Sequence, residues 1–205
     1  MSVTETLTRI SEIQSLLAPR VDAAPADDTA ASSAPFADLL AQSTAASAAT
    51  VTPLGASAGS ASARMLQIAS AEVGQAEQPP GSNDSARIAQ YRTATAGAGV
   101  GPWCAYFASW VANQAGVPLG EAGQGFGAVQ SVAEWAQRTG RWTPAGAGTP
   151  QPGDLVVWGA RHIGLVESVG ADGSISTIEG NSSDRVSRRT YDATAGGATG
   201  FVRVG

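Results

Sequence analysis

The most constraining feature of the sequence is the uneven distribution of its residue types. Residues 21–63 consist mainly of Ala, Ser, Thr, Pro and Asp, a composition that cannot build an apolar core. We therefore predict a flexible linker over 21–63 and one folded domain over 64–205. Residues 1–20 carry apolar side chains at helical spacing, which predicts a short amphipathic helix. That helix has no core of its own, so we expect it to dock on a protein partner or to fray.

Charge and hydropathy argue against two classes of function. The formal net charge is −5 and basic residues form no cluster, which argues against binding to nucleic acid. No apolar run approaches the roughly 18 residues of a membrane-spanning helix. The first residues also lack the basic start and apolar stretch of a secretory signal. A role outside the cytoplasm would therefore require another export route.

Apolar spacing within 64–205 predicts helices first and strands later. The expected helices cover 64–74, 85–91, 102–116 and 128–137, and the expected strands cover 154–158, 162–169, 174–178 and 200–204. This order favours an α+β fold with an antiparallel sheet. The five tryptophans, Trp103, Trp110, Trp135, Trp142 and Trp158, are expected in the core.

Cys104 is a candidate nucleophile. The sequence holds one Cys and one His, so it offers neither an internal disulfide nor a zinc site built from these residue types alone. A lone Cys is usually a small buried apolar residue. However, Pro102 fits the first position of the predicted helix, which places Cys104 in the first turn. Free N–H groups there stabilise both a thiolate and the oxyanion of an acyl-transfer step.

His162 begins a predicted strand whose register brings polar groups toward it. If Ala171 and Asp172 form the hairpin loop, His162 faces Asn181 and Gly164 faces Glu179, all on one side of the sheet. Glu179 or Asn181 could then orient the imidazole, as the third member of a nucleophile–base–orienter triad does. The simpler interpretations remain an ordinary strand histidine, a solvated glutamate and a turn asparagine.

The other acidic residues suggest no further site. Glu77, Asp84 and Asp154 are most simply solvated, and no cluster with metal-ligand spacing occurs. The glycine-rich stretch 97–101 lacks the lysine of a phosphate-binding loop. We expect neither a metal nor a cofactor.

Taken in order, the motifs resemble those of the CHAP family, the cysteine- and histidine-dependent amidohydrolases and peptidases. Residues 102–111 (PWCAYFASWV) are similar to the nucleophile helix of that family, and 152–158 (PGDLVVW) to the strand before the base. Residues 162–167 (HIGLVE) are similar to the base strand and 177–181 (TIEGN) to the following strand. Residues 73–74 and 79–83 also resemble members of this type. The likeness covers about 64–205, and it departs from the family pattern at Arg161, where the family often has Gly.

The resemblance implies a papain-like α+β domain that hydrolyses peptidoglycan at the stem peptides without a metal. It implies Cys104 as nucleophile, His162 as general base, Glu179 as orienter and Asn181 as a fourth polar member. The bond cut would be the N-acetylmuramoyl-L-alanine amide or a peptide bond of the stem or cross-bridge. The reaction would pass through a thioester, and it requires Cys104 to be accessible.

Two alternatives concern the biological setting, and one concerns the activity. Residues 9–17 and 36–40 resemble leader segments of wall hydrolases linked to flagellar assembly, which would explain export without a signal peptide. A phage-derived lysin would use the same chemistry. A catalytically silent wall-binding or assembly module would keep the fold without the reaction.

Overall fold

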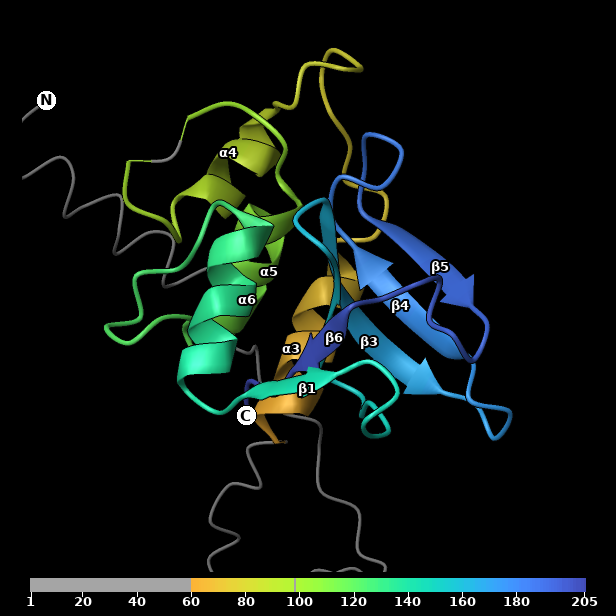
Figure 1. Cartoon of the computed structure of the whole chain (residues 1–205). Coiled ribbons are helices and arrows are strands. Elements are labelled where there is room, and N and C mark those ends of the chain that lie inside the picture. Colours follow the sequence, from red (N-terminus) through yellow and green to blue (C-terminus); the bar gives the residue numbers. More distant parts are fainter. Residues whose placement is uncertain (1–59, 98) are drawn as a thin grey trace, which may run out of the picture. The chain divides into compact units, whose positions relative to one another are not determined.

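The computed structural model describes residues 60–97 and 99–205. The predicted N-terminal helix over 1–20 and nearly all of the predicted linker over 21–63 lie outside these residues. The described part is an α+β domain in which the helices gather on one side of an antiparallel sheet (Figure 1). This arrangement confirms the predicted fold class. None of the described helices is long and apolar enough to cross a membrane.

Within the described residues, four helices precede the sheet, and each lies where apolar spacing predicts one. They are α3 (Ala61–Ala71), α4 (Ala86–Arg92), α5 (Cys104–Gln114) and α6 (Val129–Arg138). Ser60 and Ser85 cap α3 and α4, because their hydroxyls accept hydrogen bonds from the N–H groups of Ala63 and Ile88, both at 3.2 Å. Helix α3 thus begins at Ala61, slightly before the expected start of the domain at residue 64.

The sheet contains six strands in the order β1-β6-β2-β3-β4-β5, and all neighbours are antiparallel. The strands are β1 (Trp142–Pro144), β2 (Leu155–Trp158), β3 (His162–Val169), β4 (Ile175–Glu179), β5 (Ser187–Tyr191) and β6 (Gly200–Val202). The four predicted strands are present, and β3 has the expected bounds. The sequence analysis missed β1 and β5, which are the two edge strands.

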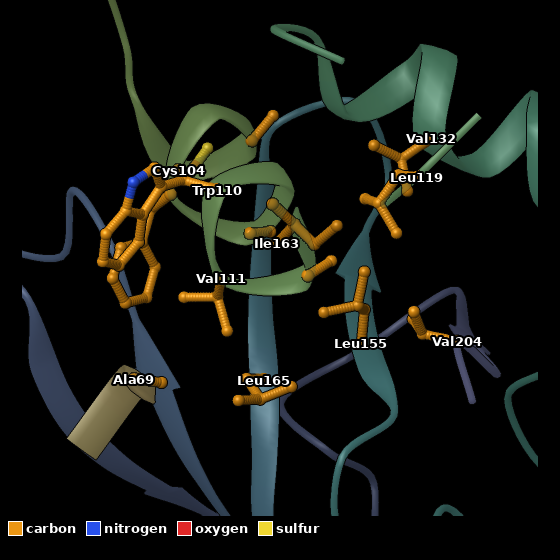
Figure 2. Packing of buried hydrophobic residues seen from close by; sticks show 14 of the residues in the cluster. Ala69, Cys104, Trp110, Val111, Leu119, Val132, Leu155, Ile163, Leu165 and Val204 are labelled. Carbon is orange, nitrogen blue, oxygen red and sulfur yellow. The ribbon is translucent and has the colours of Figure 1, made fainter. Parts of the chain in front are cut away.

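The main core lies between α5 and the sheet. Cys104, Trp110 and Val111 of α5 belong to the same buried cluster as Ile163 and Leu165 of β3 (Figure 2). A second apolar cluster covers the opposite face of the sheet, where Trp158 of β2 packs near Val166 and other residues. Apolar burial on both faces stabilises the strands and fixes which side chains point to each side. Four of the tryptophans are buried as predicted, and Trp142 is half-buried.

Two acidic residues that we expected to be solvated are buried instead. Asp154 pairs with Arg203 at 2.5 Å and accepts a hydrogen bond from the N–H of Gln151 at 2.8 Å. Glu77 is 2% exposed and lies against the start of α5. Asp84 keeps 41% of its side chain exposed, in agreement with the prediction. The prediction was wrong for Glu77 and Asp154 because their partners come from distant segments of the chain.

Candidate active site

Cys104 is the first residue of α5. Trp103 precedes it as the N-cap residue, and the N–H of Phe107 donates the first helical hydrogen bond to the carbonyl of Trp103 at 2.9 Å. The helix therefore starts at Cys104, and the predicted helical position of Pro102 is wrong. The N–H of Cys104 has no acceptor within the helix, so this end of α5 carries a partial positive charge beside the sulfur. Cys104 is only 5% exposed, less accessible than the sequence analysis expected.

His162 begins β3, next to the end of β4. Leu165 pairs with Ile178 and Val166 with Thr177, which is the register that the sequence predicted for this end of the hairpin. Extended to the first residue of β3, this register places Gly164 beside Glu179. A Cβ atom on Gly164 would lie only 2.7 Å from Cγ of Glu179. The glycine thus leaves the space that the glutamate side chain occupies.

The imidazole of His162 binds the carboxylate of Glu179. Nε2 of His162 lies 2.8 Å from Oε2 of Glu179, which is 1% exposed. The other carboxylate oxygen accepts hydrogen bonds from the hydroxyls of Thr177 at 2.6 Å and Tyr191 at 2.9 Å. Because His162 binds one carboxylate oxygen and these donors bind the other, the position of the carboxylate is fixed. Cys104 is near enough to help raise the pKa of the imidazole, and Nδ1 is the ring nitrogen that Glu179 does not bind.

The surroundings of His162 favour its protonated form. Burial disfavours the charge, but the hydrogen bonds of Cys104 and Glu179 and the charges of these groups outweigh it, and the pKa of His162 rises to about 9. Burial likewise acts to raise the pKa of Glu179, yet hydrogen bonds from His162 and Thr177 bring it below its usual value. The structure therefore favours an imidazolium–carboxylate pair at neutral pH.

An aromatic wall fixes the plane of the imidazole. The ring of Trp158 stacks on that of His162 with a centroid distance of 5.5 Å, and Tyr191 packs on Trp158 at 5.0 Å. The indole N–H of Trp158 donates to the carbonyl of Ala195 at 2.8 Å, so this wall is itself anchored. Arg161, the departure from the family pattern, is exposed in the turn before His162 and takes no part in the wall.

The amide of Asn181 binds residues other than His162. With both halves of its amide satisfied, Oδ1 accepts from the backbone N–H of Trp103 at 3.2 Å and Nδ2 donates to Oε1 of Glu77 at 3.3 Å. Its φ angle of 56° lies in the left-handed region, which asparagine tolerates in turns. The structure thus brings Cys104, His162 and Glu179 together and ties Asn181 to the start of α5 instead. Within the described residues no group of acidic, His and Cys side chains could hold a metal ion.

Sequence reasoning missed Glu77, Thr177 and Tyr191 as members of this region. Thr177 lies two residues before Glu179, so strand alternation would have placed it on the same face. Tyr191 lies in the strand that the sequence analysis missed. No pattern in the sequence singled out Glu77, which was expected to be solvated.

Comparison with known proteins supports the resemblance seen in the motifs. Residues 95–181 match the model of the CHAP domain. No curated protein matches the chain. One solved structure, an N-acetylmuramoyl-L-alanine amidase from Staphylococcus aureus, is similar with 23% identity and a TM-score of 0.39. The match covers 52% of this chain and 31% of that protein, and a likeness of this strength carries no argument about function.

Proposed function

We propose that this chain, through its CHAP domain, is a cysteine hydrolase that cleaves an amide bond in peptidoglycan at the cell wall. Cys104 would be the nucleophile and His162 the general acid and base. Glu179 would orient the imidazole and favour its protonated form. The observation that carries the proposal is the placement of His162, whose Nε2 binds the buried carboxylate of Glu179 at 2.8 Å, while Cys104 and Glu179 together raise the pKa of the imidazole. These relations are the ones expected of a nucleophile, a base and an orienting residue.

The reaction follows from these contacts. The imidazolium stabilises the Cys104 thiolate, whose sulfur attacks the carbonyl carbon of the scissile amide. The N–H of Cys104, at the positive end of α5, donates to the oxyanion that forms on the carbonyl oxygen. His162 gives its Nδ1 proton to the leaving amine, and the acyl group remains on sulfur as a thioester. His162 then removes a proton from water, which attacks the thioester, releases the carboxylic acid and restores the thiolate.

Asn181 has a different place in this proposal from the one that the family resemblance implied. The amide oxygen binds the N–H of Trp103, so that N–H is not free to stabilise an oxyanion. The N–H of Cys104 remains available for this purpose. We therefore assign Asn181 to holding the start of α5, and we leave the scissile bond as either the sugar–peptide amide or a peptide bond of the stem or cross-bridge.

The proposal is tested by hydrolysis of purified peptidoglycan. Wild type should lower the turbidity of the suspension and release soluble fragments, whereas Cys104→Ala should do neither. Glu167→Gln is a suitable control, because Glu167 lies on β3 but pairs with Arg188 at the surface. Mass spectrometry of the fragments would identify the bond as sugar–peptide or peptide–peptide. Equal inactivity of wild type and Cys104→Ala on several wall types would refute the proposal and favour a silent wall-binding module.

A further inference from the structure

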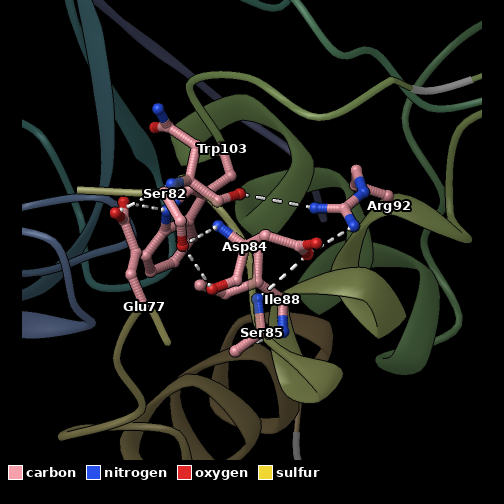
Figure 3. Close-up of polar contacts among 8 residues, drawn as sticks. Glu77, Ser82, Asp84, Ser85, Ile88, Arg92 and Trp103 are labelled. Carbon is pink, nitrogen blue, oxygen red and sulfur yellow. Dashed lines mark hydrogen bonds and ion pairs between the residues drawn. The ribbon is translucent and has the colours of Figure 1, made fainter. Parts of the chain in front are cut away.

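Glu77 is a buried carboxylate with three N–H donors from three segments. Its Oε2 accepts from the backbone N–H of Asn83 at 2.8 Å, and its Oε1 accepts from the indole N–H of Trp103 at 2.9 Å. Asn181 donates its Nδ2 to the same Oε1 at 3.3 Å. Figure 3 shows the carboxylate of Glu77 between the loop near Ser82 and the indole of Trp103. At 2% exposure, Glu77 is as deeply buried as Glu179.

The backbone around Glu77 is also anchored. The N–H of Glu77 donates to the carbonyl of Asp184 at 2.9 Å, and Ala76 forms a bridge with Arg185. Glu77 therefore sits on a segment attached to the turn after β4. Its carboxylate reaches from that segment to Trp103, the residue directly before Cys104.

These contacts join the two halves of the candidate active site. One half is the start of α5, where Trp103 precedes Cys104. The other is the end of β4, where Asn181 follows Glu179 by two residues and Glu179 binds His162. Asn181 binds both the backbone N–H of Trp103 and the carboxylate of Glu77, and the indole of Trp103 binds the same carboxylate, so the three residues form a closed triangle. A carboxylate bound on both oxygens is costly to displace from a buried site, which makes this junction rigid.

We propose that Glu77 is a positioning residue that sets the distance between Cys104 and His162, by locking the start of α5 to the end of β4. The inference rests on the proposed cysteine chemistry, but its test does not depend on the wall substrate. Glu77 lies outside the CHAP match over 95–181, so that match does not identify it.

Positioning and simple electrostatics predict opposite results when the charge of Glu77 is removed. A nearby carboxylate disfavours a thiolate, so loss of the charge alone would lower the pH at which Cys104 becomes reactive. Loss of positioning would separate Cys104 from the imidazolium, and that pH would rise. The sign of the change therefore distinguishes the two roles.

The test is the pH profile of Cys104 alkylation by iodoacetamide, which reports one site because the chain has one Cys. In Glu77→Gln the midpoint should rise by about one pH unit. On a peptidoglycan substrate, kcat should fall about tenfold or more with KM within about twofold, because misplacement affects the reacting atoms more than binding. A midpoint that stays or falls would overturn the proposal.

Asn181→Gly gives a second and milder variant. Glycine accepts the left-handed backbone of this position, so the substitution removes the two side-chain bonds without backbone strain. It should raise the same midpoint, and the double variant with Glu77→Gln should add little, because both changes open one junction. Fully additive effects would show that the two residues act separately and would also overturn the proposal.

Asp154→Asn is the matched control. Asp154 is a similarly buried carboxylate that accepts a backbone N–H, but it pairs with Arg203 away from Cys104. It should lower the melting temperature and leave the alkylation midpoint unchanged. If wild type fails to hydrolyse any wall, the proposed function fails, while the alkylation midpoints still decide the role of Glu77.

Discussion

Replacing Glu179 by Gln should lower the pKa of His162 and weaken catalysis. The carboxylate is 1% exposed and binds Nε2 of His162 at 2.8 Å, so the contact is a buried, charge-assisted hydrogen bond. Such a bond contributes about 1.5–3 kcal/mol, and one pKa unit corresponds to about 1.4 kcal/mol. The neutral amide stabilises the imidazolium less. The pKa of His162, about 9 in the wild type, should therefore fall to about 7–8.

The assay is an NMR titration of the imidazole, because His162 is the one histidine of the chain and needs no assignment among others. The basic limb of the hydrolysis profile should move by the same amount, since His162 must carry a proton to release the amine. At the wild-type optimum, kcat/KM should fall about 10- to 100-fold.

Glu167→Gln is the control for this experiment, since its partner is Arg188 rather than His162. Its His162 titration should match that of the wild type. A Glu179→Gln protein that also titrates like the wild type would refute the reasoning, because the hydrogen bond would then not be the source of the raised pKa.

Three further predictions concern the same contacts. Gly164→Ala should lower hydrolysis more than about tenfold and also lower the melting temperature, because its Cβ would lie 2.7 Å from Cγ of Glu179 and displace that buried carboxylate. Thr177→Val keeps the buried shape but removes a hydroxyl donor to Glu179, so urea unfolding should show a loss of about 1.5–3 kcal/mol. The raised pKa of His162 implies stability that is complete below its usual pKa of 6.5 and is lost as the pH rises through about 9. Thermal melts should therefore show a larger decline over this range in wild type than in His162→Gln.

The parts of the site that the sequence predicted are those governed by local pattern. Apolar spacing placed the nucleophile helix, and the period of two in β3 placed His162 and Gly164 on one face. Cys104 lies in the first turn as expected, although the helix begins later than Pro102 suggested. These features depend on neighbours within a few residues, so a single sequence contains enough information to find them.

The parts that the sequence could not predict depend on contacts between distant segments. Glu77 is buried because three N–H groups from different loops converge on it, and no local pattern encodes that convergence. β5 was missed because its residues are mostly polar and exposed, as an edge strand permits. Asn181 was placed beside His162 because its register was extended past the end of β4, where the chain in fact turns.

The hairpin between β3 and β4 differs from the prediction in two ways that compensate each other. The N–H of Gly170 donates to the carbonyl of Ser174 at 2.7 Å, so the turn is one residue longer than the predicted two-residue loop. A bulge between Val166 and Ser168 then leaves Glu167 as an extra residue in β3. Beyond the bulge, Val166 pairs with Thr177 as predicted. The side chains therefore lie on the predicted faces of the strands, because each apolar residue must stay buried on its own side of the sheet.

Deletion of Glu167 tests this account of the register. Val166 faces Thr177 on one side of the bulge and Ser168 faces Ser176 on the other. Removal of the extra residue would therefore leave a continuous β3 in which both of these pairs are kept. Inward side chains would stay inward, and the loss would be the surface pair with Arg188, which contributes about 1 kcal/mol or less. Hydrolysis should therefore stay within a few fold of wild type, and His162 should still titrate near pH 9.

Deletion of Ser176 shortens the same hairpin by one residue and should have the opposite result. It would turn Ile175, which is buried against the second apolar cluster, toward the other face of the sheet. Loss of that burial costs about 2–5 kcal/mol, so the variant should unfold at lower temperature and lose the raised pKa of His162. If the Glu167 deletion behaved like the Ser176 deletion, the bulge itself would be needed to hold His162 against Glu179, and burial of the apolar residues would not be what sets the register.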